Sequence, residues 1–88
     1  MLFMVIETFP VGLEPVRERF QTKGRMLPPN VSYIASWLEP DGSRCFQLME
    51  APDREALQPW VDAWKDIGGF DIRPVLTSAD FWSAYPKT

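Results

Sequence analysis

The sequence contains no histidine and only one cysteine, Cys45. Without histidine the chain lacks the commonest general base, the commonest zinc and copper ligand, and any Ser-His or Cys-His nucleophile pair. A single cysteine excludes an internal disulfide and every metal site built from several cysteines, and it fits a reducing compartment. The sequence therefore predicts a cytoplasmic protein with no metal and no cofactor.

Positive charge is also scarce. Nine basic residues stand against twelve acidic ones, which gives a formal net charge of −3. A DNA-binding protein needs a basic surface to neutralise phosphates. A sheet that recognises RNA would need aromatic and basic residues on its first and third strands, and residues 45–49 supply only Phe46. We therefore expect no nucleic-acid partner.

Long hydrophobic runs are absent as well. Residues 1–6 are apolar, but they lack a basic leader and are followed at once by Glu7. Such a stretch is neither a signal peptide nor a membrane span. We interpret it as a buried strand and expect no membrane partner.

Large apolar side chains, by contrast, are abundant. In 88 residues, 45% are hydrophobic and 14% aromatic, with four tryptophans and six phenylalanines. The length suits one domain spanning residues 1–88, and the core of so small a domain cannot readily hide this much apolar surface. Self-association into a homodimer is the economical explanation.

Hydrophobic periodicity and turn residues predict six main elements. Strands are expected at residues 2–9, 31–39, 45–50 and 70–77, and helices at 15–23 and from 53 or 57 to 67. The second helix starts near Leu57 or kinks, because Pro59 cannot lie inside a regular helix. Pro74 marks an edge strand or a bulge. A short apolar tail follows, with Phe81, Trp82 and Tyr85.

This order of strands and helices predicts an α+β domain of the ferredoxin-like βαββαβ type. With right-handed crossovers, the four-stranded antiparallel sheet has the order 4-1-3-2 and carries both helices on one face. No layer of the chain covers the other face, so an apolar surface there would need a partner. We expect a second copy to cover it and to form a dimeric α/β barrel.

The hairpin over residues 31–51 can adopt two registers. In the preferred one, Glu39 closes against Ser43 around a three-residue loop at 40–42. One face then carries Tyr33, Ala35, Trp37, Cys45, Gln47 and Met49, and the other carries Ile34, Ser36, Leu38, Phe46 and Leu48. A two-residue turn at Asp41 and Gly42 would shift the pairing by one and exchange the faces of the second strand.

The preferred face supplies the candidate ligand site. Polar groups there stand among aromatic and sulfur neighbours and need partners, which can be backbone, each other or a ligand. The predicted ligand-binding residues are Tyr33, Trp37, Cys45, Gln47 and Met49. Packing in the core is the competing interpretation of each, and for Cys45 an inert buried thiol is favoured because no base accompanies it.

Charged side chains give a second candidate. Glu7, Arg44 and Arg73 are expected at the same end of the sheet, where they could orient an acidic substrate or form an ion-pair network. The network is the favoured interpretation. Basic residues at 17, 19, 23 and 25 could bind an anion, but interleaved glutamates favour a solvated helix face.

Several local motifs resemble one family of short bacterial proteins. They are the segments 24–28 (GRMLP), 36–37 (SW), 41–42 (DG), 44–50 (RCFQLME) and 74–79 (PVLTSA), together with Trp60 and Trp64. That family carries only a domain-of-unknown-function label and is placed near the dimeric α/β-barrel proteins. The resemblance implies the fold and the dimer. Related barrels include cofactor-free monooxygenases, muconolactone isomerase and small stress-response domains, so the fold selects no reaction.

Two functions remain open from the sequence. The protein can be a small-molecule-binding dimeric barrel, with a metal-free monooxygenase-like or isomerase-like activity on an apolar or aromatic compound. Alternatively, it is a non-catalytic dimerisation or stress-related module. An enclosed cavity on the order of a few hundred Å³, bordered by Tyr33, Trp37 and Gln47, would favour the first, and a filled core would favour the second.

Overall fold

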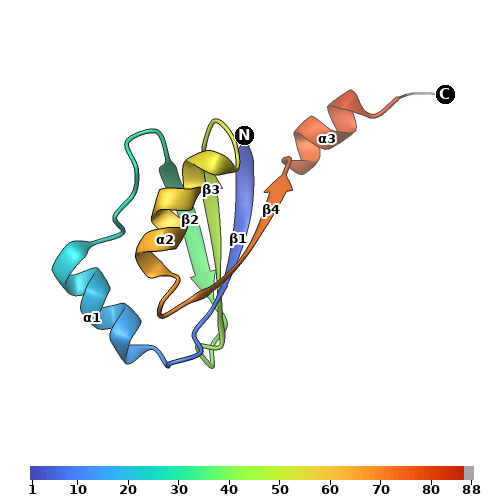
Figure 1. Ribbon diagram of the computed structural model, residues 1–88. Helices are drawn as coiled ribbons and strands as arrows, with labels where there is room; N and C mark the ends of the chain where they lie inside the picture. The colour runs from blue at the N-terminus through green and yellow to red at the C-terminus, as the bar shows by residue number, and fades with distance from the viewer. Residues whose placement is uncertain (87–88) are drawn as a thin grey trace.

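The computed structural model describes residues 1–86 of the chain. Four strands and three α-helices follow one another with a single 3-10 turn (Figure 1). Their bounds are β1 Leu2–Thr8, α1 Glu14–Lys23, β2 Ser32–Leu38, β3 Arg44–Glu50, η1 Glu55–Leu57, α2 Gln58–Trp64, β4 Gly69–Val75 and α3 Ser78–Ala84.

The sheet confirms the predicted fold. Its order is β2-β3-β1-β4, which is the expected 4-1-3-2 read from the other edge, and the pairs β1–β3, β1–β4 and β2–β3 are all antiparallel. β1 lies in the middle and β4 at an edge. Pro74 therefore belongs to an edge strand, where a missing N–H donor is tolerated. The chain has the ferredoxin-like α+β fold.

The core lies between the sheet and α2. Trp60, Val61 and Trp64 are buried against Phe3 and Val5 of β1 and the neighbouring strands. The structure decides how this helix accommodates Pro59. A 3-10 turn precedes α2, and Pro59 lies in the first turn of the α-helix, where the missing N–H is no loss. The start near Leu57 is thus the correct alternative.

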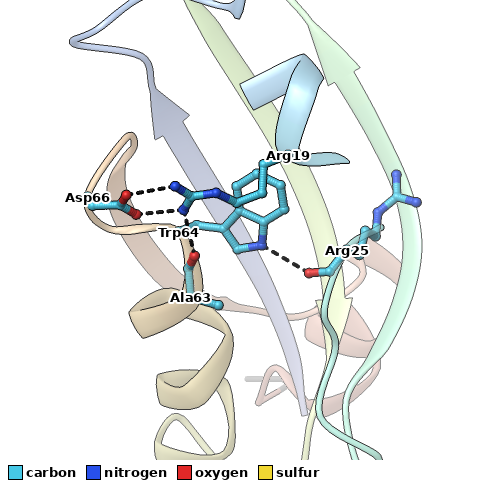
Figure 2. A network of polar contacts seen from close by, with 5 residues as sticks. All are labelled: Arg19, Arg25, Ala63, Trp64 and Asp66. Carbon is cyan, nitrogen blue, oxygen red and sulfur yellow. Dashed lines mark hydrogen bonds and ion pairs between the residues drawn. The ribbon is translucent and has the colours of Figure 1, made fainter. Parts of the chain in front are cut away.

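α1 packs more loosely than α2. It contains no buried residue, and its Phe20 is 45% exposed. Polar contacts attach it to α2 instead (Figure 2). Arg19 donates to the Ala63 carbonyl at 2.9 Å and forms a two-pronged ion pair with Asp66 at 2.7 Å. A helix held by its polar contacts leaves space between itself and the sheet.

The hairpin differs from the preferred register. Tyr33 pairs with Met49 as expected, but the register shifts between Tyr33 and Ala35, so that Trp37 pairs with Phe46 and Leu38 with Cys45. The prediction that Trp37 and Cys45 are cross-strand neighbours is wrong. A bulge adds one residue to a strand and moves all later side chains to the opposite face. Near the turn, the faces are those of the alternative register.

The second face of the sheet has no helix over it. α1 and α2 lie on one side, and α3 projects from the end of β4 away from the rest of the chain (Figure 1). The pairing register places the charged side chains of Arg44, Glu50, Asp71 and Arg73 on this bare face. It also assigns to this face the apolar side chains of Leu2, Met4, Ile6, Ala35, Trp37, Phe46, Leu48 and Val75. We call this set the bare sheet face. None of the helices over residues 1–86 is long and apolar enough to cross a membrane.

Candidate functional site

A cavity of about 170 Å³ lies on the helix side of the sheet, below α1 and close to the β2–β3 turn. Aromatic and aliphatic side chains form most of its wall. Its lining consists of Glu7, Phe9, Leu13, Val16, Phe20, Arg25, Ser36, Leu38, Cys45, Gln47, Trp60 and Trp64. The space exists because α1 stands away from the sheet there. Three lining side chains are ionisable: Glu7, Arg25 and Cys45.

Glu7 is the most unusual group in this cavity. It follows Phe3 and Val5 on the helix-facing side of β1, and it is only 8% exposed. Its Oε1 atom is buried and has no hydrogen-bond partner among residues 1–86. Burial raises the pKa of Glu7 from 4.5 to about 7, and the positive charge of Arg25 partly opposes that rise. A buried carboxyl oxygen without a donor is rare in native structures.

Arg25 supplies the positive charge. Its guanidinium lies 3.5 Å from the centre of the Tyr33 ring and 5.2 Å from that of Phe20, and it forms no ion pair within residues 1–86. Its carbonyl accepts a 3.0 Å hydrogen bond from Trp64 Nε1, while the side chain points away from that indole (Figure 2). The loop thus holds Arg25 at the cavity without neutralising it.

The backbone around Arg25 is also specialised. Gly24 has φ 67° and Met26 has φ 57°. Glycine adopts this left-handed region readily, but methionine pays about 1 kcal/mol or more to do so. Strained positions of this kind persist where the surrounding structure fixes them, often beside ligand sites. The strain at Met26 is consistent with a loop shaped to direct Arg25.

A strip of polar groups continues along the sheet from Glu7. Cys45 lies opposite Glu7 in the β1–β3 register, Gln47 lies opposite Val5, and Ser36 lies opposite Gln47 on β2. Cys45 and Gln47 are buried. The Tyr33 hydroxyl and Ser36 Oγ share a hydrogen bond of 2.7 Å. The cavity therefore has one polar wall and an otherwise aromatic and aliphatic lining.

Cys45 is a thiol rather than a thiolate at neutral pH. Burial, followed by the negative charge of Glu7, raises the pKa of Cys45 to about 11. Reactive cysteines have lowered pKa values and electropositive surroundings. The geometry agrees with the interpretation of Cys45 as an inert group.

A larger hollow of about 570 Å³ lies between the start of β1 and α3. Its lining side chains carry no charge: Met1, Leu2, Pro74, Val75, Leu76, Ser78, Phe81 and Trp82. It is an open groove formed because α3 projects from the sheet. We therefore place the candidate site in the smaller cavity, where unpaired charged groups converge.

Comparison with known proteins identifies the family. The sequence matches the family described as Domain of unknown function (DUF3303) over residues 1–88. The chain belongs to this family. No curated protein and no solved structure matches it.

The DUF3303 fold brings together three of the five predicted ligand-binding residues. Cys45 and Gln47 line the cavity, and Tyr33 lies beside it through its contacts with Ser36 and Arg25. Met49 is fully buried in the core. Trp37 belongs to the bare sheet face and is 55% exposed, because the bulge before Ala35 reverses its direction.

The predicted cluster of Glu7, Arg44 and Arg73 does not form in this DUF3303 chain. Glu7 points to the helix side, whereas Arg44 pairs with Thr8 and Arg73 with Met4, in the opposite phase of the strands. Both arginines have other partners. Arg44 forms an ion pair with Glu39, and Arg73 forms one with Asp71 at 2.9 Å. Side-chain alternation explains the difference, because it directs Glu7 to one face of the sheet and both arginines to the other.

Arg25 is the site residue that the sequence did not reveal in this role, and Ser36 was expected on the opposite face of the hairpin until the register shift brought it beside Gln47. The basic residues of the first helix were expected to form a solvated face, but Arg19 reaches across to α2 and Arg25 lines the cavity. For Glu7, by contrast, the sequence did contain a signal. Phe3, Val5 and Glu7 alternate along β1, which places a carboxyl group in the buried series of a central strand.

Proposed function

We propose that this protein binds a small apolar or aromatic molecule in the cavity between the sheet and α1. The unpartnered Oε1 of Glu7 carries this proposal. A buried acceptor without a donor costs about 1–3 kcal/mol, more when it is charged. A ligand that donates a hydrogen bond would recover that free energy, and the aromatic walls would contact its apolar part.

The size of the cavity suits a small ligand. An apolar cavity of about 150 Å³ is large enough to bind benzene. The cavity here measures about 170 Å³. We therefore propose a compound with a single ring, such as an aromatic acid or a small lactone. The metal-free monooxygenase and isomerase activities remain predictions from the resemblance, and a cytoplasmic location remains a prediction from the single cysteine.

We also propose that the protein is a homodimer in which the bare sheet face of one chain covers that of the other. The face presents apolar side chains from β1, β2, β3 and β4 with no helix over them. Water contact with this many apolar side chains is unfavourable, and a stable dimer buries about 800 Å² per partner. A non-catalytic dimerisation or stress-related module is the second candidate function, and this bare face favours it.

Substitution of Gln47 tests the binding proposal. A thermal-shift screen of aromatic acids and lactones first identifies compounds that raise the melting temperature of the wild-type protein. Gln47→Leu should abolish most of that increase, because the ligand loses the amide in the polar wall of the cavity. Folding should change little, since a buried amide and an apolar side chain of similar shape often differ little in stability.

Gln21→Leu is the matched control, because Gln21 is exposed on α1 outside the cavity. It should keep the full ligand response. If compounds stabilise Gln47→Leu as much as the wild type, they bind elsewhere and the proposed site is wrong. If no compound stabilises the wild type, the dimerisation module becomes the better account.

A further inference from the structure

We propose that the ligand is a single-ring hydroxyaromatic compound, whose hydroxyl group donates to Glu7 and whose second polar group, a carbonyl or carboxylate, accepts from Arg25. This inference rests on the proposed function and adds the chemical class of the ligand. Two charged side chains of opposite sign line one cavity, and the structure pairs them neither with each other nor with other charged groups of residues 1–86.

The two charges together discriminate among ligand classes. An amine would pair with Glu7 but would be repelled by Arg25. A simple carboxylate would pair with Arg25 but would bring no donor to Glu7 Oε1. A hydrocarbon would leave both groups unsatisfied. A ring with a hydroxyl at one end and an acceptor at the other satisfies both, and its faces can contact the aromatic walls.

The surroundings of Glu7 make it the group that controls binding. Among the residues that face it, β3 contributes the Cys45 thiol, the loop after α1 contributes Arg25, β4 contributes the apolar Phe70, and α2 contributes Trp60 and Trp64. Cys45 stays protonated up to about pH 11 because its pKa is raised to about 11. Arginine stays charged throughout. The charge of the cavity near neutral pH is therefore set by Glu7.

This arrangement predicts how affinity depends on pH. A hydroxyl donates a stronger hydrogen bond to a carboxylate than to a neutral acid. The pKa of Glu7 in the free protein is about 7. Affinity for a hydroxyaromatic ligand should therefore rise as Glu7 ionises between acidic and mildly alkaline pH. The difference between charge-assisted and neutral hydrogen bonds corresponds to about a tenfold gain.

The test uses 4-methylphenol and 1,4-dimethylbenzene. The two compounds have nearly the same shape, and a methyl group in the second replaces the hydroxyl of the first. The phenol resembles the tyrosine side chain, with a pKa of about 10, so it stays neutral from about pH 5.5 to about pH 8.5. Titrations followed by NMR on the wild-type protein should show about tenfold tighter binding of 4-methylphenol at the higher pH. The hydrocarbon should show no gain, because it offers no donor to the carboxylate.

Glu7→Gln should remove the pH dependence for 4-methylphenol, and Glu50→Gln, at the exposed end of β3, should preserve it. 4-Hydroxybenzoate, in which a carboxylate replaces the methyl group, should bind more tightly than 4-methylphenol to the wild type, and Arg25→Gln should abolish that advantage. The inference would be overturned if the affinity of the wild type for 4-methylphenol did not change with pH, or if Glu7→Gln kept the same pH dependence. If the thermal-shift screen finds ligands but no hydroxyaromatic compound binds, this inference fails while the proposed function stands.

Discussion

Glu7 occupies a position on the buried side of β1, where the other side chains of the same series are apolar. Phe3 and Val5, the two preceding members of the same series, are almost completely buried. The carboxyl group is kept there without a hydrogen-bond donor for Oε1 among residues 1–86. Protonation is the cheapest response to such burial, which is why the pKa rises to about 7. The free energy of unfolding therefore depends on pH through the protonation of Glu7.

The sign of this linkage gives a prediction for folding. The unfolded chain releases the Glu7 proton near pH 4.5, whereas the folded chain retains it to about pH 7. The folded state therefore holds more protons in between, and stability falls as pH rises through this window, by an amount on the order of 3 kcal/mol. The chain contains no histidine, whose own titration in this pH range would otherwise obscure the effect.

Urea unfolding of the ligand-free protein at about pH 5 and about pH 8 measures this difference. Glu7→Gln should flatten the profile and should be more stable than the wild type at the higher pH. Glu50→Gln should retain the wild-type slope. A wild-type stability that is constant over this range would contradict the burial of an ionisable Glu7.

The helical elements divide into those that build the core and those that do not. α2 buries Trp60, Val61 and Trp64, whereas neither α1 nor α3 buries any residue. α3 is well formed all the same, because the Thr77 hydroxyl caps it by accepting from the Asp80 N–H at 3.0 Å. Its aromatic side chains contact one another, with ring centres of Phe81 and Trp82 5.1 Å apart. An ordered helix with exposed aromatic residues is expected to dock on a second copy.

Truncation after Ala79 tests the role of α3. Light scattering at micromolar concentration should give about twice the chain mass of 10.2 kDa for the full-length protein. The truncated protein should form a weaker dimer, with a higher dissociation constant than the full-length protein, because it lacks Phe81, Trp82 and Tyr85. Its ligand cavity should be unaffected, since no residue of α3 lines it. A full-length monomer would rule out the dimer, and an unchanged dimer after truncation would show that α3 plays no part in it.

The elements were predictable from sequence to a greater degree than the site. Turn residues, strand periodicity and the positions of Pro59 and Pro74 determine the strands, the helices and their order. The bulge between Tyr33 and Ala35 has no local signal, and it moved Trp37 to the other face. The role of Arg25 depends on a loop whose path is set by the tertiary contact of its carbonyl with Trp64. Distant contacts of this kind are not encoded in local pattern.

At the scale of the whole molecule, the shape is extended for its length. The radius of gyration is 14.6 Å, compared with about 12 Å for a compact domain of this size. α3 accounts for the projection (Figure 1). The two faces of the sheet have different proposed roles: the helix side carries the ligand cavity, and the bare sheet face and α3 meet a second chain. Dimerisation and ligand binding would then occupy separate surfaces.

The most direct test of the account is a ¹³C NMR titration of the Glu7 carboxyl group in the intact protein, with and without 4-methylphenol. The free protein should show a Glu7 pKa of about 7. Because a ligand that prefers the ionised form about tenfold must lower the pKa reciprocally, saturation should bring it to about 6. A Glu7 carboxyl that titrates near 4.5, the ordinary value for glutamate, and does not respond to the ligand would contradict the claim that Glu7 is the buried acceptor of a ligand site.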